Sequence, residues 1–141
     1  GWAEAAVLLA AARGDTSVRA PGGGRAEAEV AAGGAVRVRV ECGDPLDEVV
    51  LRSYCVGAAH MGLGWVRSEG IAVDAAGRPQ DLTIRSFGIL RARDMPDVDV
   101  EVGATAGPPV AVSDAVFAAV AAAAWRADGY PPCWPTRRGG S

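Results

Sequence analysis

The chain contains no lysine, so arginine supplies all 14 of its basic residues. These arginines are spread along the chain rather than gathered into one basic block, and the formal net charge is -3. Proteins that bind nucleic acid through its phosphates carry a basic patch or stripe. The charge pattern therefore argues against a nucleic-acid partner, and we expect the arginines on solvated strand faces and in ion pairs.

Histidine and cysteine are also scarce. The single histidine, His60, excludes a metal site built from several histidines, and the three cysteines (Cys42, Cys55 and Cys133) show no C-x-x-C spacing. An odd number of cysteines argues against a disulfide framework, and the missing spacing argues against a zinc knuckle. Unpaired cysteines are typical of a reducing compartment, so we expect a cytoplasmic protein with Cys55 as a small apolar helix residue.

Aromatic residues make up only 6% of the chain, although 50% of it is hydrophobic. The core must therefore consist mainly of Ala, Val and Leu. No apolar run approaches the roughly 20 residues that a membrane span needs, and the first residues lack the basic region of a signal peptide. We expect no membrane association, and 141 residues suffice for one domain with one core.

The region from Leu46 to Arg91 predicts a long helix followed by a hairpin. We expect the helix to end near Arg67, with Asp44 as its cap and Pro45 at its first position. Residues recurring three or four apart predict one buried face of this helix, namely Val50, Tyr54, Gly57, Ala58, Met61 and Trp65. A period of two then predicts the hairpin, with Ile71, Val73, Leu82 and Ile84 directed at the helix.

Three glycines lie inside this predicted helix, Gly57, Gly62 and Gly64. Each costs about 1 kcal/mol relative to Ala in a helix interior. Such a cost indicates that the helix backbone lies close to another helix, a sheet or a ligand. Glycine spacing alone favours packing over a ligand.

The segments on either side complete an α+β fold. We expect a helix over 3–13 that ends at Gly14, a flexible glycine-rich linker to residue 25, a hairpin over 26–40, a strand over 97–102 and a helix over 115–127 capped by Ser113 or Asp114. The glycine triplet at 22–24 lacks the lysine and Ser/Thr of a phosphate-binding loop. The predicted divisions are therefore an N-terminal helix and linker (1–25), an α+β module (26–129) and a proline- and aromatic-rich tail (130–141) that lies across a surface.

No arrangement of residues in the sequence supports catalysis by the chain alone. His60 and Cys55 are five residues apart on the predicted helix rather than three or four. The alternating acids Asp97, Asp99 and Glu101 are typical of the solvated side of an edge strand. No G-x-S-x-G elbow accompanies the serines.

Five segments occur in an order and spacing that resemble one family. They are Arg25 to Pro45, Gly57-Ala58-Ala59-His60-Met61-Gly62-Leu63-Gly64, Glu69 to Gly77, Phe87 to Pro96, and Pro108 to Trp125. Together they resemble the C-terminal part of the molybdopterin-binding subunit of the xanthine dehydrogenase and aldehyde oxidase family, the molybdenum hydroxylases. The resemblance covers about residues 26–129. It implies β-hairpins and a mixed or antiparallel sheet packed on a long central helix and a C-terminal helix.

This resemblance implies a role in an oxidoreductase that hydroxylates a heterocycle or an aldehyde at a molybdenum-pterin cofactor. In the family, a glutamine of the Gly-Ala helix contacts the pterin, and a glutamate before the Pro-Pro pair is the general base. Here the first position falls on Tyr54 and the second on Gly107. A phenol does not reproduce the paired donor and acceptor of an amide, and a glycine cannot accept a proton.

We therefore expect no catalytic residue and no metal ligand in this chain, with Tyr54, Gly57 and Ala58 as the candidates for a cofactor contact. The first hypothesis is an accessory subunit or split C-terminal module that works with a larger molybdopterin-binding subunit and with FAD and iron-sulfur subunits. The isolated chain would then hold no cofactor and would not be a competent enzyme. The second hypothesis is a free-standing, non-enzymatic interaction or oligomerisation domain. The third is a small enzyme with chemistry at Cys55, His60 or the acidic strand.

Overall fold

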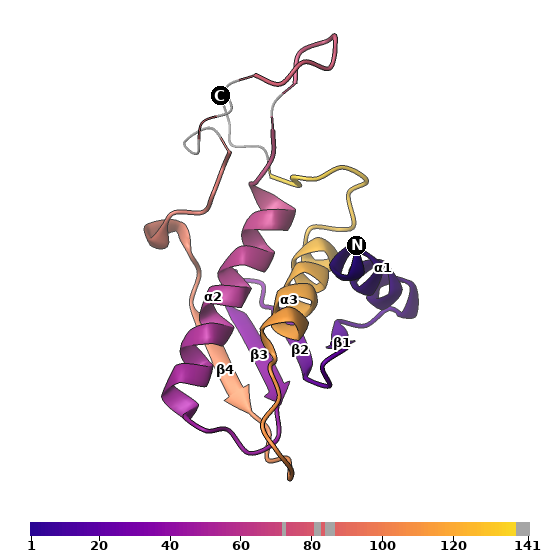
Figure 1. The fold of residues 1–141 in the computed structure, drawn as a ribbon. Coiled ribbons are helices and arrows are strands. Elements are labelled where there is room, and N and C mark those ends of the chain that lie inside the picture. Colours follow the sequence, from indigo (N-terminus) through magenta and orange to yellow (C-terminus); the bar gives the residue numbers. More distant parts are fainter. Residues whose placement is uncertain (72, 81–82, 84–86, 138–141) are drawn as a thin grey trace.

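The computed structural model describes residues 1–71, 73–80, 83 and 87–137 (Figure 1). The helices are α1 (Trp2–Arg13), α2 (Glu48–Arg67) and α3 (Ser113–Ala127), and η2 (Ala92–Asp94) is a short 3-10 turn. The strands are β1 (Ser17–Arg19), β2 (Arg25–Val30), β3 (Val36–Glu41) and β4 (Val98–Val102). Their order along the chain confirms the predicted α+β class.

The four strands form one mixed sheet in the order β1-β2-β3-β4. The pairs β1-β2 and β2-β3 are antiparallel, as hairpins require, while β4 lies parallel to β3. A parallel pair needs a crossover connection, and α2 lies in the segment that joins β3 to β4. The predicted hairpin over residues 26–40 is confirmed, with Val30 opposite Val36.

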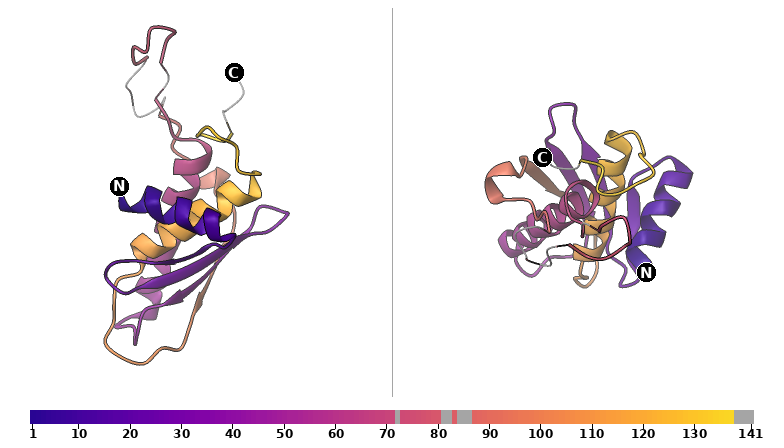
Figure 2. Two further views of the ribbon diagram at one scale, coloured as in Figure 1. Left: turned by 90° about the vertical axis from the view of Figure 1, so that its right-hand side faces the viewer. Right: turned by 90° about the horizontal axis from the view of Figure 1, so that it is seen from above.

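The core lies between the inner face of the sheet and the helices. Val36, Val38 and Val40 of β3 are all at most 2% exposed and face α3. Helix α3 lies between α2 and α1, with the sheet beneath it (Figures 1 and 2). Almost every residue of α3 from Ala115 to Ala124 is buried, since neighbours surround it on several sides. Its many alanines let these neighbours approach closely.

The expected linker between residues 15 and 25 contains the strand β1, so that part of the expectation is wrong. Val18 is only 4% exposed and lies opposite Ala26 of β2. The glycines that follow form the turn of this hairpin, in which the Ala20 N–H donates to the Gly24 carbonyl at 2.8 Å. Two buried side chains, Val18 and Ala20, and a closed turn order the segment, and periodicity cannot detect a strand of three residues.

Helix α2 begins later than expected, and Asp47 rather than Asp44 is its cap. The Asp47 carboxylate accepts hydrogen bonds from the N–H groups of Val49 and Val50 at 2.9 and 3.1 Å. Asp44 instead donates its backbone N–H to the Gly107 carbonyl at 3.0 Å. Both residues suit a cap. In the structure, the backbone of Asp44 is bonded to the distant loop of Gly107, and the helix begins after Asp47. Similarly, α3 starts at Ser113 with Val112 in the cap position, not Ser113 or Asp114.

The predicted buried face of α2 is wrong in most of its residues. Val50, Tyr54 and Met61 are 47%, 65% and 56% exposed, and a Cβ added to Gly57 would have no neighbouring atom within 4 Å. The face that packs on α3 and the sheet is rotated about the helix axis and consists of Cys55, Ala58, Ala59, Gly62, Leu63 and Val66. Helix α2 is apolar on both sides, so the spacing alone could not select the side that faces the core. We call Val50, Tyr54, Gly57 and Met61 the α2 stripe.

Two of the three glycines of α2, Gly62 and Gly64, lie against neighbouring atoms, whereas Gly57 does not. A Cβ on Gly62 would lie 2.7 Å from the Phe117 carbonyl oxygen, so Gly62 allows α2 and α3 to cross closely, as the packing interpretation expects. A Cβ on Gly64 would lie 2.5 Å from the Glu69 carboxylate. Gly57 faces open space. Its place in the helix is therefore not explained by contacts within this chain.

The expected hairpin after α2 is reduced to a turn in the described residues. Asp74 accepts hydrogen bonds from the N–H groups of Ala76 and Arg78, both at 2.9 Å, and Val73 forms a single bridge with Pro79. Ile71 and Val73 are 55% and 60% exposed, so they do not cover the helix as expected. Leu82 and Ile84 lie outside the described residues.

The tail crosses the ends of α2 and α3, as expected for a surface-covering segment. Trp134 packs edge-on against Trp65 and Trp125, with ring centroids 4.8 and 5.7 Å away. The Thr136 N–H donates to the Val66 carbonyl at 2.8 Å and caps the end of α2. Trp134 of the tail is therefore part of the packed structure. The division of the chain at residues 25 and 130 stays a prediction.

Candidate functional site

A shallow hollow of about 200 Å³ lies beside the first turns of α2. Its lining comes from the segment after β3, the start of α2 and the segment before α3, and comprises Cys42, Pro45, Leu46, Asp47, Val50, Leu51, Tyr54, Pro109 and Val110. Most of these side chains are apolar. The hollow joins one end of the α2 stripe through Val50 and Tyr54.

Hydrogen bonds donated by backbone N–H groups hold the two loops of this hollow together. The Val110 N–H donates to the Cys42 carbonyl at 2.9 Å, and the Gly43 N–H donates to the Thr105 hydroxyl at 2.8 Å. Gly43 has φ +71°, and a Cβ there would lie 2.2 Å from the Pro108 carbonyl oxygen. Glycine is thus required at this crossing, which places the loop of Gly107 next to the start of α2.

The three candidates for a cofactor contact lie on two different sides of α2. Tyr54 lines the hollow and is 65% exposed, and Gly57 is exposed one turn further along. Ala58 is 2% exposed and packs in the core, so its side chain is not accessible to a ligand. The structure thus brings Tyr54 and Gly57 to one accessible face and separates Ala58 from them.

Gly107, which the sequence resemblance assigned to the family's general-base position, is an exposed loop residue two positions before Pro109 of the hollow. Its φ is +110°, a conformation that residues with a side chain rarely adopt. A glutamate could not occupy this position without a backbone change that costs about 1–3 kcal/mol. The backbone at this position therefore favours glycine over a residue with a side chain.

The buried cysteines do not provide a nucleophile. Burial raises the pKa of the Cys55 thiol to about 11, and the neighbouring Cys42 adds to this effect. Burial likewise raises the pKa of Cys42, with a further contribution from the Asp44 carboxylate. Both thiols are therefore protonated at neutral pH, whereas the thiolate is the reactive form. Cys133 is exposed on the tail.

His60 has a structural contact. Its Nε2 lies 2.8 Å from the Leu90 carbonyl oxygen and so ties the segment before η2 to α2. Glu69 lies near the end of the same helix, where burial raises the pKa of its carboxyl and the charge of His60 partly offsets this. His60 lies on α2, whereas the acidic residues of β4 extend from the outer face of the sheet. The structure does not join these groups and Cys55 into one site.

The described residues contain no group of three or more His, Cys, Asp or Glu side chains that could hold a metal ion. Within the same part of the chain, no helix has both the length and the apolar character needed to cross a bilayer.

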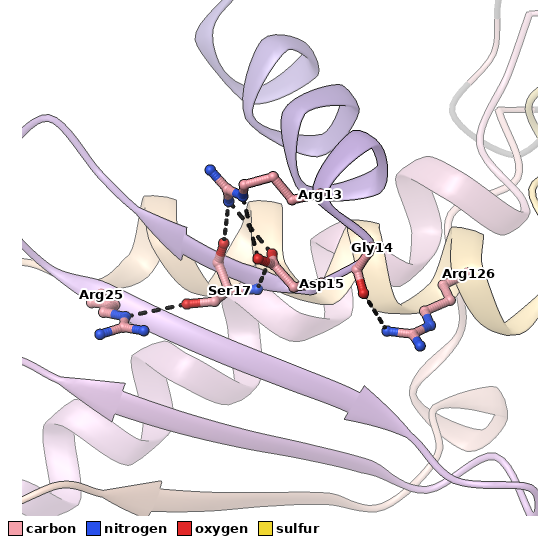
Figure 3. Close-up of polar contacts among 6 residues, drawn as sticks. All are labelled: Arg13, Gly14, Asp15, Ser17, Arg25 and Arg126. Atoms are coloured by element: carbon pink, nitrogen blue, oxygen red, sulfur yellow. Dashed lines mark hydrogen bonds and ion pairs between the residues drawn. The ribbon is translucent and has the colours of Figure 1, made fainter.

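A second hollow, of about 410 Å³, lies between β2 and the end of α3. Arg126, which lines this hollow, belongs to a cluster of polar contacts at the end of α1 (Figure 3). Arg13 donates to the Asp15 carboxylate and to the Ser17 carbonyl, and the Arg126 guanidinium donates to the Gly14 carbonyl at 3.2 Å. These contacts fix the end of α1 against β1 and α3. The cluster therefore has a structural role.

The most buried ion pair was not found by sequence reasoning. The Arg67 Nε and Nη2 atoms donate to the two carboxylate oxygens of Asp128 at 3.0 and 2.9 Å, and these side chains are only 9% and 8% exposed. The Thr136 hydroxyl donates to the same carboxylate at 2.6 Å. Arg67 and Asp128 lie at the ends of two helices that are distant in sequence, so spacing gives no signal for this pair.

The fold is similar to one part of a much larger oxidoreductase chain. The solved structure is quinoline 2-oxidoreductase from Pseudomonas putida 86, which matches at 18% sequence identity with a TM-score of 0.56. The match covers 72% of this chain but only 14% of the enzyme chain. At this identity the likeness concerns the fold. No family model matches the sequence, and no curated protein matches it.

Proposed function

We propose that this chain is an accessory module of a molybdenum hydroxylase type of complex, in which it completes or braces a larger molybdopterin-binding subunit. FAD and iron-sulfur subunits belong to such a complex. The module lends shape to the complex and performs no chemistry of its own. The proposal combines the ordered motifs of the sequence with the likeness of the fold to a small part of quinoline 2-oxidoreductase.

The exposed α2 stripe is the observation that carries this proposal. A small domain that functions alone gains stability by burying its apolar helix faces, and a helix that is apolar on both sides is typical of a buried position. Gly57, in the middle of the stripe, destabilises the helix relative to Ala, although a Cβ at this position would meet no atom of this chain within 4 Å. A partner whose backbone approaches α2 closely at Gly57 accounts for both features.

The position of the stripe agrees with the resemblance. Tyr54, which stands at the pterin-contacting position of the family, lies on the stripe and lines the hollow next to the loop of Gly107. On this proposal, the exposed side of α2 would correspond to the cofactor-facing side of the family fold. Because Gly107 has no carboxylate, the base and the cofactor would both belong to the larger subunit, and residues Tyr54 and Gly57 would contact that subunit or its cofactor.

Affinity purification of the tagged chain at its native level tests this function. We expect to recover a chain with molybdopterin-binding segments, and molybdenum in proportion to that chain. Met61→Glu should abolish recovery because it places a charge in the contact, while Val73→Glu, an equally exposed apolar position away from α2, should not. A monomer without such a partner would contradict the proposal. So would a symmetric, cofactor-free homo-oligomer, the outcome that the interaction-domain hypothesis requires, or one molybdenum atom per isolated chain.

A further inference from the structure

Strand β4 is the last strand of the sheet and pairs with β3 on one side only. Its bonds to β3 include the Val36 N–H donating to the Asp97 carbonyl at 2.8 Å. In a parallel pair, alternate residues direct both backbone groups to the same neighbour. The residues between, Val98, Val100 and Val102, therefore direct their N–H and C=O groups to the free edge.

This edge already accepts a cationic donor from outside the sheet. The Arg52 guanidinium of α2 donates to the Val100 carbonyl, while its own side chain stays 44% exposed and pairs with Glu48. The inner side chains of Val98 and Val102 are half-buried, whereas that of Val100 is 6% exposed. The edge thus leaves both backbone groups and apolar surface uncovered at its two ends.

The outer face of the sheet carries charges that alternate from strand to strand. Arg37 of β3 lies between Glu29 of β2 and Asp99 of β4. In the next row, Arg39 lies between Glu27 and Glu101, and its guanidinium is 3.8 Å from the Glu101 carboxylate. Each row therefore ends in an exposed acid at the free edge. Opposite charges placed directly across a strand pair stabilise the pairing, so the next strand is expected to be basic.

The present neighbour of β4 indicates which sequence pattern pairs well with it. Strand β4 reads Val-Asp-Val-Glu-Val, and β3 beside it reads Val-Arg-Val-Arg-Val over residues 36–40. A strand added at the free edge would lie beside the same side chains of β4 that β3 contacts from the other side, with Asp99 and Glu101 on the outer face and the valines on the inner face. We propose that the free edge of β4 binds an extended segment of another protein in which apolar residues alternate with Arg or Lys. The basic residues extend the charged rows, and the apolar residues cover Val98 and Val102.

A second copy of this chain does not fit the edge through its own β4. A symmetric pair of β4 strands would place Asp99 and Glu101 of one copy among the same acids of the other, and like charges directly opposite each other are destabilising. The free edge of β4 is a surface distinct from the α2 stripe. Binding of a basic segment there does not require a molybdenum hydroxylase partner.

Binding of short peptides to the full chain tests the inference by NMR and fluorescence anisotropy. The probe is an acetylated peptide with the sequence Thr-Val-Arg-Val-Arg-Val-Thr, and its control has Glu in place of both Arg. We expect only the basic peptide to bind, with slowed hydrogen exchange at the Val98 and Val102 amides. Asp99→Asn with Glu101→Gln should weaken binding about fivefold to tenfold. The matched variant, Glu27→Gln with Glu29→Gln, removes the same charge two strands away and should change binding less than about twofold.

Val98→Pro separates edge pairing from a purely electrostatic contact. The Val98 N–H faces the free edge, so proline at this position removes an edge donor without removing a bond to β3. We expect it to abolish binding of the basic peptide while the thermal unfolding of the chain stays cooperative. The inference is overturned if neither peptide binds at about 1 mM, if both bind equally, or if the protected amides appear without peptide as the chain concentration rises.

Discussion

Removing the Asp128 carboxylate measures how much the buried ion pair with Arg67 contributes to the free energy of unfolding. In Asp128→Ala, the Arg67 guanidinium loses both of its 2.9–3.0 Å hydrogen bonds, although its side chain is only 9% exposed. Breaking a buried pair by removing one partner costs about 3–5 kcal/mol, because the remaining charge stays buried. The Thr136 hydroxyl also loses its acceptor. We expect urea unfolding to show a loss of this size, and the melting temperature to fall by on the order of 10 °C.

Two control variants show whether the burial of the charge causes this loss. Glu48→Ala breaks an equally close ion pair to Arg52, but both side chains are about half exposed, and such pairs contribute at most about 1 kcal/mol. Arg67→Met combined with Asp128→Leu removes both charges and should cost less than Asp128→Ala alone. A loss below about 1 kcal/mol for Asp128→Ala would refute the reasoning, since it would mean that water reaches the charge left behind.

The same pair predicts a dependence on pH. Burial raises the pKa of the Asp128 carboxyl, but hydrogen bonds from Arg67 and Thr136 outweigh burial and hold the pKa below its ordinary value. A carboxyl whose pKa is lower in the folded than in the unfolded chain stabilises the fold fully above its unfolded pKa of about 3.9. This contribution declines as the pH falls through the folded value. The stability difference between the native chain and Asp128→Ala should therefore shrink below about pH 4, measured by urea unfolding.

Two further predictions concern the helices and the thiols. Gly57→Ala should stabilise the chain by about 0.5–1 kcal/mol in urea unfolding, because the position is open and helical. Gly62→Ala should instead destabilise it by about 1–2 kcal/mol, since its Cβ would lie 2.7 Å from the Phe117 carbonyl oxygen, and equal effects at both sites would contradict the packing of α2 on α3. Iodoacetamide at about pH 8 should alkylate the exposed Cys133 and leave Cys42 and Cys55 unmodified until the chain unfolds, as counted by mass spectrometry. Rapid alkylation of Cys55 in the folded chain would contradict its pKa of about 11.

The candidate site was only partly predictable. The resemblance assigned Tyr54 and Gly107 to the family's pterin-contacting and base positions, and the structure places their segments next to each other beside one hollow. Sequence spacing could not show that Ala58 turns into the core while Tyr54 stays outside, because both follow Val50 at helical intervals. It also could not show the left-handed backbone of Gly107.

The sequence by itself determined the α+β class, the C-terminal ends of the helices and which side of each main strand faces the core. It could do so because local rules govern them: Gly14 adopts φ +72° to end α1, and alternate valines place one face of β3 in the core. Only the tertiary structure decided which face of α2 is buried, which aspartate caps that helix and where the tail lies. Those choices depend on contacts between residues far apart in the chain, such as Gly62 with Phe117 and Arg67 with Asp128.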